Sequence, residues 1–215
     1  MIRGVLFDLD GTLIDSTGAI VTSLYHTFDT LGLPRPDRKT IVDSIGFPLA
    51  VQLGMLTSHD AGECTRIYRA HYMATANGST TLLPGTRELL AALACAGMKI
   101  GFATSKKRSA AEMLLEHLGV LHYFEVRLGP DDVIHAKPHP EVVEKAVALM
   151  GLRLDEVLFV GDMYFDVEAG KAAGVRTIAV ATGYNTRAEL EALQPHAVID
   201  SLHELLDGDG HLLPL

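Results

Sequence analysis

The chain has 215 residues with a formal net charge of −9, and 48% of its residues are hydrophobic and 21% charged. This composition is typical of a globular protein, and the length suits one large domain or one domain that carries a smaller insertion. The acidic balance and the absence of Trp disfavour nucleic-acid binding, which needs a basic surface and often aromatic platforms for the bases.

The sequence also gives expectations about the cellular location. No apolar run approaches the roughly 18 residues that a membrane span needs, so we expect no membrane partner. No basic and apolar leader precedes the first predicted strand, and Cys64 and Cys95 have no metal-ligand spacing. These features predict a cytoplasmic protein with reduced thiols. Monomeric and homodimeric assembly both fit the sequence.

The first predicted element is a strand that begins at Val5. The segment Val5-Leu6-Phe7-Asp8-Leu9-Asp10-Gly11-Thr12 is apolar and then abruptly polar. A continuous apolar run is typical of a buried strand in a parallel sheet. The strand therefore delivers Asp8 and Asp10 at its carboxyl end, and Gly11 permits the turn that follows.

Residues 15–83 have a different character. Apolar residues recur at helical spacing, and further helices are expected over residues 38–44, 49–56 and 60–76. No convincing strand is expected in this stretch. We interpret it as a small all-helical cap domain, residues 15–83, inserted into a core made of residues 1–14 and 84–215.

After Pro84 the predicted elements alternate regularly. The predicted helices cover residues 87–96, 108–118, 140–150, 165–173 and 187–193, and the predicted strands cover residues 98–103, 124–128, 157–160, 177–180 and 197–199. Strands that alternate with helices through short loops form a parallel sheet with right-handed crossovers. The predicted fold class is therefore α/β, with a Rossmann-like, doubly wound parallel sheet.

Ligands of open parallel sheets bind beyond the carboxyl ends of the strands. Several polar side chains follow predicted strands at these ends, or begin the next helix: Asp8, Asp10, Thr104, Ser105, Lys106, Lys137, Asp162 and Asp166. We expect these side chains to meet at one edge of the sheet.

This set of side chains fits phosphoryl transfer. Mg²⁺ prefers carboxylate oxygens, which Asp8 and Asp162 supply, and it reduces the repulsion between an anionic nucleophile and a phosphate. Asp8 is the candidate nucleophile, and Lys137 balances charge. Asp10 is the candidate general acid and base. The candidate phosphate ligands are Thr104, Ser105 and Gly11.

At this point the sequence resembles the haloacid dehalogenase-like superfamily. The segment Phe7-Asp8-Leu9-Asp10-Gly11-Thr12-Leu13 resembles its first motif, and Thr104-Ser105-Lys106 resembles its second. The segment Lys137-Pro138-His139-Pro140-Glu141 is similar to the third, and Gly161-Asp162 with Asp166 to the fourth. The four motifs occur in the family's order and span most of the chain.

The resemblance implies several roles. Mg²⁺ would be held by the Asp8 side chain, the Asp10 backbone carbonyl and Asp162, whereas Asp166 would bind the metal through water or orient Asp162 and Lys137. The insertion after the first motif would be a mobile cap that excludes water when it closes.

Within the family, Asp10 argues against a dehalogenase, which lacks the second aspartate. Lys39 is the only lysine of residues 15–83, and the loop at Gly46, Phe47 and Pro48 has none, which argues against a phosphonate hydrolase that uses a cap lysine. The uncharged loop is similar to those of phosphoglycolate phosphatase-like members, and it is the candidate substrate contact of the cap. We therefore expect an Mg²⁺-dependent phosphatase that acts on a small phosphate ester similar to phosphoglycolate. The alternatives are a phosphohexomutase, an inorganic pyrophosphatase and, more remotely, a non-catalytic binding module.

Overall fold

A six-stranded parallel sheet forms the centre of the computed structural model, which describes residues 1–214. Its strand order is β5-β4-β1-β6-β7-β8, and every neighbouring pair is parallel. The strands are β1 (Gly4–Phe7), β4 (Lys99–Ala103), β5 (Val126–Leu128), β6 (Val157–Gly161), β7 (Arg176–Val180) and β8 (Ala197–Ile199). The predicted α/β class with a doubly wound parallel sheet is confirmed.

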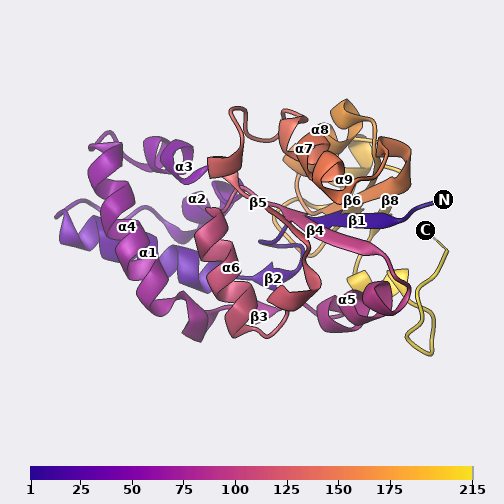
Figure 1. Ribbon diagram of the computed structural model, residues 1–215. Helices are drawn as coiled ribbons and strands as arrows, with labels where there is room; N and C mark the ends of the chain where they lie inside the picture. The colour runs from indigo at the N-terminus through magenta and orange to yellow at the C-terminus, as the bar shows by residue number, and fades with distance from the viewer. Residues whose placement is uncertain (215) are drawn as a thin grey trace.

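The central strand β1 is buried on both faces, and its side chains alternate between two apolar clusters. Val5 and Phe7 of β1 belong to one cluster, and Leu6 between them belongs to the other. The first cluster contains residues of α5 (Thr86–Cys95) and α6 (Arg108–His117), and the second contains residues of α7 (Glu141–Met150) and α8 (Tyr164–Ala173). Helices therefore cover both faces of the sheet (Figure 1).

Shorter elements complete the core. The helix α9 (Arg187–Ala192) precedes β8, and Thr186 accepts a hydrogen bond from the Glu189 amide at its start. Single 3₁₀ turns occur at η2 (Leu121–Tyr123), η3 (Pro130–Asp132), η4 (Leu154–Glu156) and η5 (Leu202–Leu205). None of the described helices is long and apolar enough to cross a membrane.

The strand order creates a switch point beside β1. From β1 the chain winds outward through β4 to β5, and it then returns to β6 on the other side of β1. The carboxyl ends of β1 and β6 consequently flank the crevice at which ligands bind in such sheets. Asp8 directly follows β1, and Asp162 directly follows β6.

The segment between β2 (Ile14–Asp15) and β3 (Thr81–Leu82) is helical, and we call it the helical insert. It contains α1 (Thr17–Thr30), α2 (Arg38–Asp43), α3 (Leu49–Leu56), α4 (Ala61–Thr75) and the 3₁₀ turn η1 (Ala76–Ser79). The expectation that residues 15–83 contain no strand is wrong, because β2 and β3 pair as a two-residue antiparallel ribbon. Two residues are too few to produce an alternating pattern, so the ribbon has no signal in the sequence.

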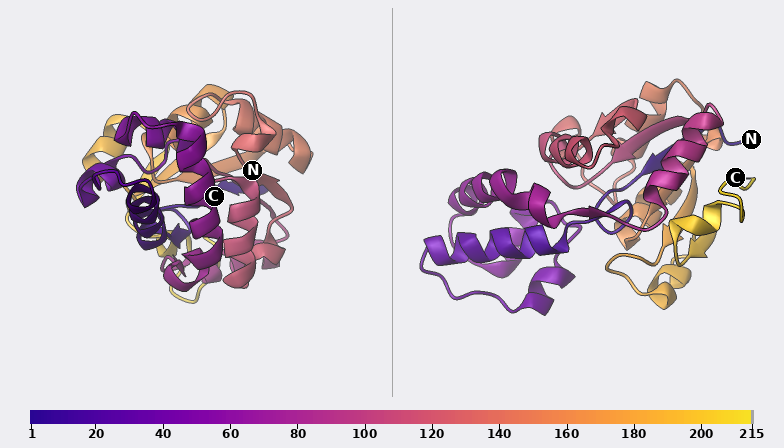
Figure 2. Two further views of the ribbon diagram at one scale, coloured as in Figure 1. Left: turned by 90° about the vertical axis from the view of Figure 1, so that its left-hand side faces the viewer. Right: turned by 90° about the horizontal axis from the view of Figure 1, so that it is seen from below.

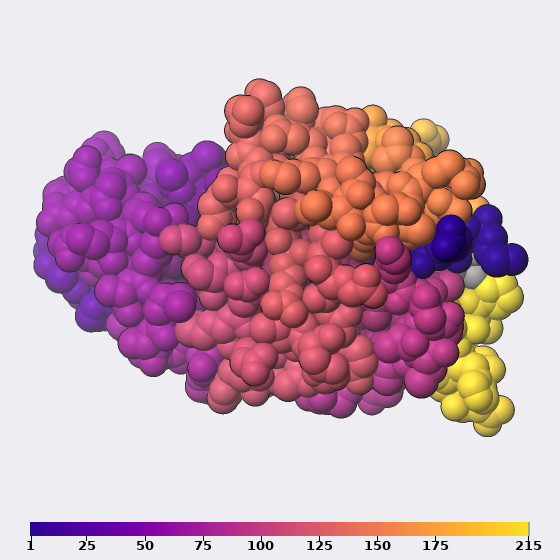
Figure 3. Space-filling view, viewed as in Figure 1, coloured from indigo at the N-terminus to yellow at the C-terminus, as the bar shows by residue number. Residues whose placement is uncertain are grey.

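The helical insert forms a lobe at one end of the molecule, and both termini lie at the opposite end (Figures 1 and 2). In the space-filling view this lobe lies against the core beside α6 (Figure 3). Residues of the insert such as Leu24, Leu53 and Tyr68 join the same apolar cluster as Phe7 of the core. The insert is therefore packed against the carboxyl edge of the sheet and not only tethered to it.

Candidate active site

Asp8 and Lys137 form the centre of the site. Lys137 Nζ lies 2.8 Å from Asp8 Oδ1 and 2.6 Å from Asp166 Oδ1, and it donates a third hydrogen bond to the Ala103 carbonyl at 3.2 Å. The three charged side chains are buried. Among the described residues no group donates a hydrogen bond to Asp8 Oδ2, so this oxygen is available to a ligand.

Asp162 is held by the loops that follow β1 and β7. The Thr12 hydroxyl donates to Asp162 Oδ1 at 2.8 Å, and the Tyr184 amide donates to Oδ2 at 3.3 Å. Gly183 packs so closely that a Cβ atom there would lie 1.7 Å from Asp162 Oδ2. Gly11 approaches the same oxygen, and its φ of +86° favours glycine. These contacts fix the orientation of a fully buried carboxylate.

The charges of this cluster favour the binding of a cation. Burial raises the pKa of Asp8 to about 7, against the opposing effect of Lys137. Burial and the neighbouring carboxylates of Asp166 and Asp8 also raise the pKa of Asp162. Burial disfavours the charged form of Lys137, but Asp166 and Asp8 outweigh it and raise the lysine pKa. Lys137 pairs with Asp8 and Asp166, whereas Asp162 has no ion pair among the described residues, so a divalent cation would relieve the repulsion of the three carboxylates.

The donor set fits Mg²⁺. Asp8, Asp162 and Asp166 each offer a carboxylate oxygen, and these oxygens lie within 4.8 Å of one another. Hard oxygen ligands of this kind, completed by water, are what Mg²⁺ prefers. Both oxygens of Asp166 already have partners, because Lys137 binds Oδ1 and the Met163 amide donates to Oδ2 at 3.0 Å. The oxygens of Asp162 also have partners, in the Thr12 hydroxyl and the Tyr184 amide, so among the three carboxylates only Asp8 has an oxygen that accepts no hydrogen bond from the described residues.

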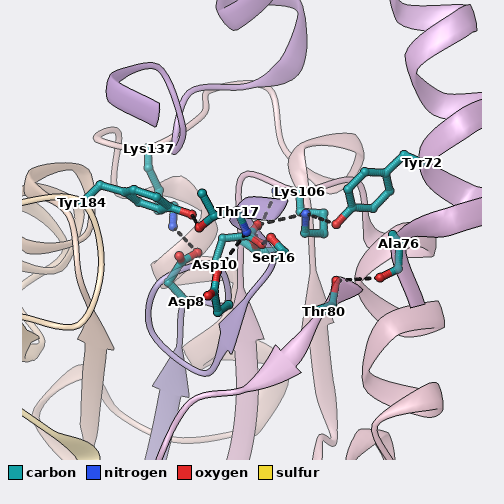
Figure 4. A network of polar contacts seen from close by, with 12 residues as sticks. Asp8, Asp10, Ser16, Thr17, Tyr72, Ala76, Thr80, Lys106, Lys137 and Tyr184 are labelled. Atoms are coloured by element: carbon teal, nitrogen blue, oxygen red, sulfur yellow. Dashed lines mark hydrogen bonds and ion pairs between the residues drawn. The ribbon is translucent and has the colours of Figure 1, made fainter. Parts of the chain in front are cut away.

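Asp10 has its hydrogen-bond and ion-pair partners outside this cluster, although it lines the same cavity as Asp8. Its Oδ2 lies 3.1 Å from Lys106 Nζ, and its Oδ1 accepts a hydrogen bond from the Ser16 hydroxyl. Lys106 in turn donates to the Tyr72 hydroxyl of α4 at 2.9 Å (Figure 4). The strand ends at Phe7, so Asp8 and Asp10 turn toward different partners. A hydrogen-bonded chain thus connects Asp10 to the helical insert.

The other predicted phosphate ligands differ in what they offer. Thr104 is buried, and its hydroxyl accepts a hydrogen bond from the Lys106 amide at 3.1 Å. Ser105 is partly exposed, and both residues line the cavity beside Asp8. The Gly11 amide donates to the Ile14 carbonyl at 2.9 Å, so it is not free to donate to phosphate. Gly11 instead contributes to packing around Asp162.

A cavity of about 420 Å³ lies between the site and the helical insert. Gly46, Phe47 and Pro48 line it, together with Asp8, Asp10 and Lys137. The Phe47 ring meets the Phe165 ring of the core edge to face, with centroids 4.7 Å apart. A Cβ atom on Gly46 would lie 2.1 Å from Met163 Sδ. The loop at residues 46–48 therefore packs directly on the core at the start of α8.

Sequence reasoning missed four contributors to this site. Gly183 and Tyr184 belong to the loop after β7, for which no motif was assigned, although their position after a strand was a usable signal. Tyr72 lies among apolar residues of α4, and nothing in the sequence around it indicates that its hydroxyl accepts a hydrogen bond from Lys106. Thr12 lies inside the first motif, but its spacing does not reveal that its partner is Asp162.

Comparison with known proteins places this site in a family. The family model described as "Haloacid dehalogenase-like hydrolase" matches residues 5–180. A pyrophosphatase PpaX from Halalkalibacterium halodurans is 36% identical over 96% of this chain and 96% of its own length. A phosphoglycolate phosphatase from Pectobacterium atrosepticum is 33% identical over 98% of this chain and 93% of its own.

A solved structure supports the same assignment. A haloacid dehalogenase-like family hydrolase from Streptococcus pneumoniae superimposes with a TM-score of 0.85 at 30% sequence identity. The match covers 94% of this chain and 96% of that structure. Together with the motifs and the strand order, these similarities show that the chain belongs to the haloacid dehalogenase-like hydrolase family.

Proposed function

We propose that this protein is an Mg²⁺-dependent phosphatase that hydrolyses a small phosphorylated metabolite through an aspartyl-phosphate intermediate. The observation that carries the proposal is the buried group of Asp8, Lys137, Asp162 and Asp166, in which Asp8 lines a cavity and keeps one oxygen without a hydrogen bond from the described residues. The names of the relatives, pyrophosphatase and phosphoglycolate phosphatase, support hydrolysis at phosphorus.

In the first step an oxygen of Asp8 attacks phosphorus, and the bond from phosphorus to the leaving oxygen breaks. Asp10 gives its proton to that oxygen, and the product alcohol leaves. In the second step Asp10 takes a proton from water, and the water oxygen attacks the phosphorus of the aspartyl phosphate. Inorganic phosphate leaves, the Asp8 carboxylate is restored, and Asp10 is protonated again.

The other residues provide the electrostatic setting. Mg²⁺, held by Asp8, Asp162 and the Asp10 carbonyl, would supply positive charge opposite the phosphate oxygens. Lys137 would neutralise further charge, and Asp166 keeps Lys137 in position through the contact at 2.6 Å. Ser105 and Thr104 would bind the phosphate oxygens.

The helical insert would act as a cap. We propose residues 15–83 as the cap and residues 1–14 with 84–215 as the catalytic core. The contacts of Gly46 and Phe47 with the core support this role, because they close one side of the cavity against water. The two-stranded ribbon of β2 and β3 would be the connection about which the cap moves.

The substitution Asp8→Asn tests the nucleophile. It preserves shape but removes the negative charge, so release of phosphate from an aryl phosphate should fall by roughly three orders of magnitude or more. The exposed Asp43 of α2 offers a matched control, and Asp43→Asn should retain wild-type turnover. Turnover that survives Asp8→Asn would refute the mechanism.

Pyrophosphate hydrolysis is the second candidate, favoured by the 36% identity to a pyrophosphatase over almost the whole chain. To separate this candidate from a phosphomonoesterase, phosphate release is measured from pyrophosphate and from 2-phosphoglycolate at equal concentrations, with and without Mg²⁺. Incubation with glucose 1-phosphate and a bisphosphate activator tests the mutase alternative, for which isomerisation would exceed phosphate release.

A further inference from the structure

The cavity above Asp8 has a charged floor and an apolar wall. The floor contains Asp8, Asp10, Lys106 and Lys137 at the carboxyl edge of the sheet. The wall is built mainly by the helical insert, and its apolar lining residues there include Ile20, Ile45, Phe47, Leu49, Tyr68 and Met73. Met163 and Phe165 extend the apolar wall on the core side.

The two lysines of the floor already have partners. Lys137 is paired with Asp8 and Asp166, and Lys106 is paired with Asp10 and the Tyr72 hydroxyl. Lys106 also lies 4.6 Å from the centroid of the Tyr72 ring. Neither lysine is therefore free to bind a second anionic group of a substrate.

Arg69 and Lys107 are the only other cations among the described lining residues, and both are exposed. Attraction between exposed charges is weakened by water and salt. A carboxylate or second phosphate at the far end of a substrate would thus leave bulk water and face mostly hydrocarbon. Such a transfer is unfavourable unless the anion is paired.

The cavity is also larger than a two-carbon leaving group requires. Its volume of about 420 Å³ falls in the range of pockets that enclose whole small-molecule ligands. The edge-to-face contact of Phe47 with Phe165 already closes one side, so the insert cannot shrink this volume from there without changing that contact. Glycolate would leave much of the apolar wall in contact with water.

Building on the proposed phosphatase function, we infer that the substrate is the phosphate ester of an uncharged alcohol that bears an aromatic or branched aliphatic group. The phosphate would lie on the charged floor, and the apolar group would cover the wall formed by Phe47, Leu49 and Met73. Removal of this apolar surface from water is what would favour the ester over phosphoglycolate or pyrophosphate.

Steady-state kinetics on a matched series test the inference. Methyl, ethyl, propyl, butyl and benzyl phosphate all have alcohol leaving groups, so changes in kcat/KM report mainly on contacts with the wall. We expect kcat/KM to rise about three- to fourfold with each added methylene. Benzyl phosphate should exceed both 2-phosphoglycolate and pyrophosphate by at least tenfold.

Two methionines provide a matched pair of variants. Met73 of α4 lines the cavity and Met55 of α3 does not, although the two side chains are similarly exposed, at 43% and 55%. Met73→Gln should lower the ratio of kcat/KM for benzyl phosphate to that for methyl phosphate severalfold. Met55→Gln should leave the ratio unchanged. Equal ratios in the wild type and Met73→Gln would contradict the assignment of the wall.

The outcomes separate the inference from the function on which it rests. If 2-phosphoglycolate or pyrophosphate is the best substrate, and Arg69→Gln selectively lowers its kcat/KM, the inference is overturned while the phosphatase function stands. If no phosphate ester is hydrolysed above the level of Asp8→Asn, the proposed function and the inference both fail.

Discussion

The core and the helical insert make opposite contributions to the same cavity. The core supplies a floor of buried charges, each held by a partner, as with Lys137 between Asp8 and Asp166. The insert supplies mainly hydrocarbon, and the Tyr72 hydroxyl is its one hydrogen bond to a core lysine among the described residues. This difference supports our proposal that the chemistry resides in the core and the selection of the leaving group in the insert.

Among the core residues that support Asp8, the largest effect is expected from Lys137→Ala. The change leaves the buried carboxylates of Asp8 and Asp166 without their cation and removes a positive charge near the phosphate. We expect kcat to fall roughly 10²- to 10³-fold. The steady-state rate of phosphate release at saturating substrate measures this fall in kcat.

Lys39 of the insert is the matched control for that experiment. Its ammonium group lies 2.5 Å from Asp43, and its side chain is 83% exposed. Exposed pairs of this kind contribute little, so Lys39→Ala should behave as the wild type. Equal losses from the two lysine variants would contradict the division between a catalytic core and an apolar insert.

Gly183→Ala should have the next largest effect. The added Cβ would lie 1.7 Å from Asp162 Oδ2, so the carboxylate must move. Displacing a ligand or its support typically costs about 10- to 100-fold in metal affinity. Calorimetric titration with Mg²⁺ measures the change.

Gly54 on α3 of the insert has open space around it, and Gly54→Ala is the control that should leave Mg²⁺ affinity unchanged. Its helix should gain slightly in stability, because alanine favours helix more than glycine does. An unaltered Mg²⁺ affinity in Gly183→Ala would show that Asp162 tolerates displacement and is not a metal ligand.

The two regions also differ in how far the sequence predicts them. Asp8 and Asp162 follow from the carboxyl ends of strands, because apolar runs locate the strands and parallel pairing brings their ends together. Lys137 follows from its place just before the next predicted helix. The role of Tyr72 and the β2–β3 ribbon cannot be predicted in this way. An apolar pattern on α4 is the same whether a tyrosine packs or also accepts a hydrogen bond from Lys106. Such contacts depend on how the insert lies on the core, which local periodicity does not encode.

We expect the pH dependence of Mg²⁺ affinity to arise from Asp8 of the core and not from the insert. Burial raises the Asp8 pKa from 3.8 to about 7 in the metal-free protein. Between these values the native state holds the proton more tightly than the unfolded chain, so this group's contribution to stability is lost as pH rises toward 7. Mg²⁺ requires the deprotonated carboxylate, so its apparent affinity should rise by up to about tenfold per pH unit below 7.

Thermal unfolding with and without Mg²⁺ checks this expectation. The rise in Tm caused by Mg²⁺ should be larger at pH 7.5 than at pH 5.5. Asp43→Asn in the insert should keep that pH dependence, and Asp8→Asn should flatten it. A rise in Tm that is the same at both pH values in the wild type would contradict proton displacement from Asp8.

The smallest effect is expected where the two regions meet. Tyr72→Phe removes the hydroxyl that accepts a hydrogen bond from Lys106 but keeps the ring beside the ammonium group. The contact between Lys106 and Asp10 remains, so kcat/KM should fall only about three- to tenfold, which corresponds to the net contribution of one ordinary hydrogen bond. Hydrogen exchange should become faster in α4, because one link to the core is lost.

Tyr123→Phe, remote from the cavity, is the control. If Tyr72→Phe matched that control in both measurements, the insert would act through its apolar wall alone.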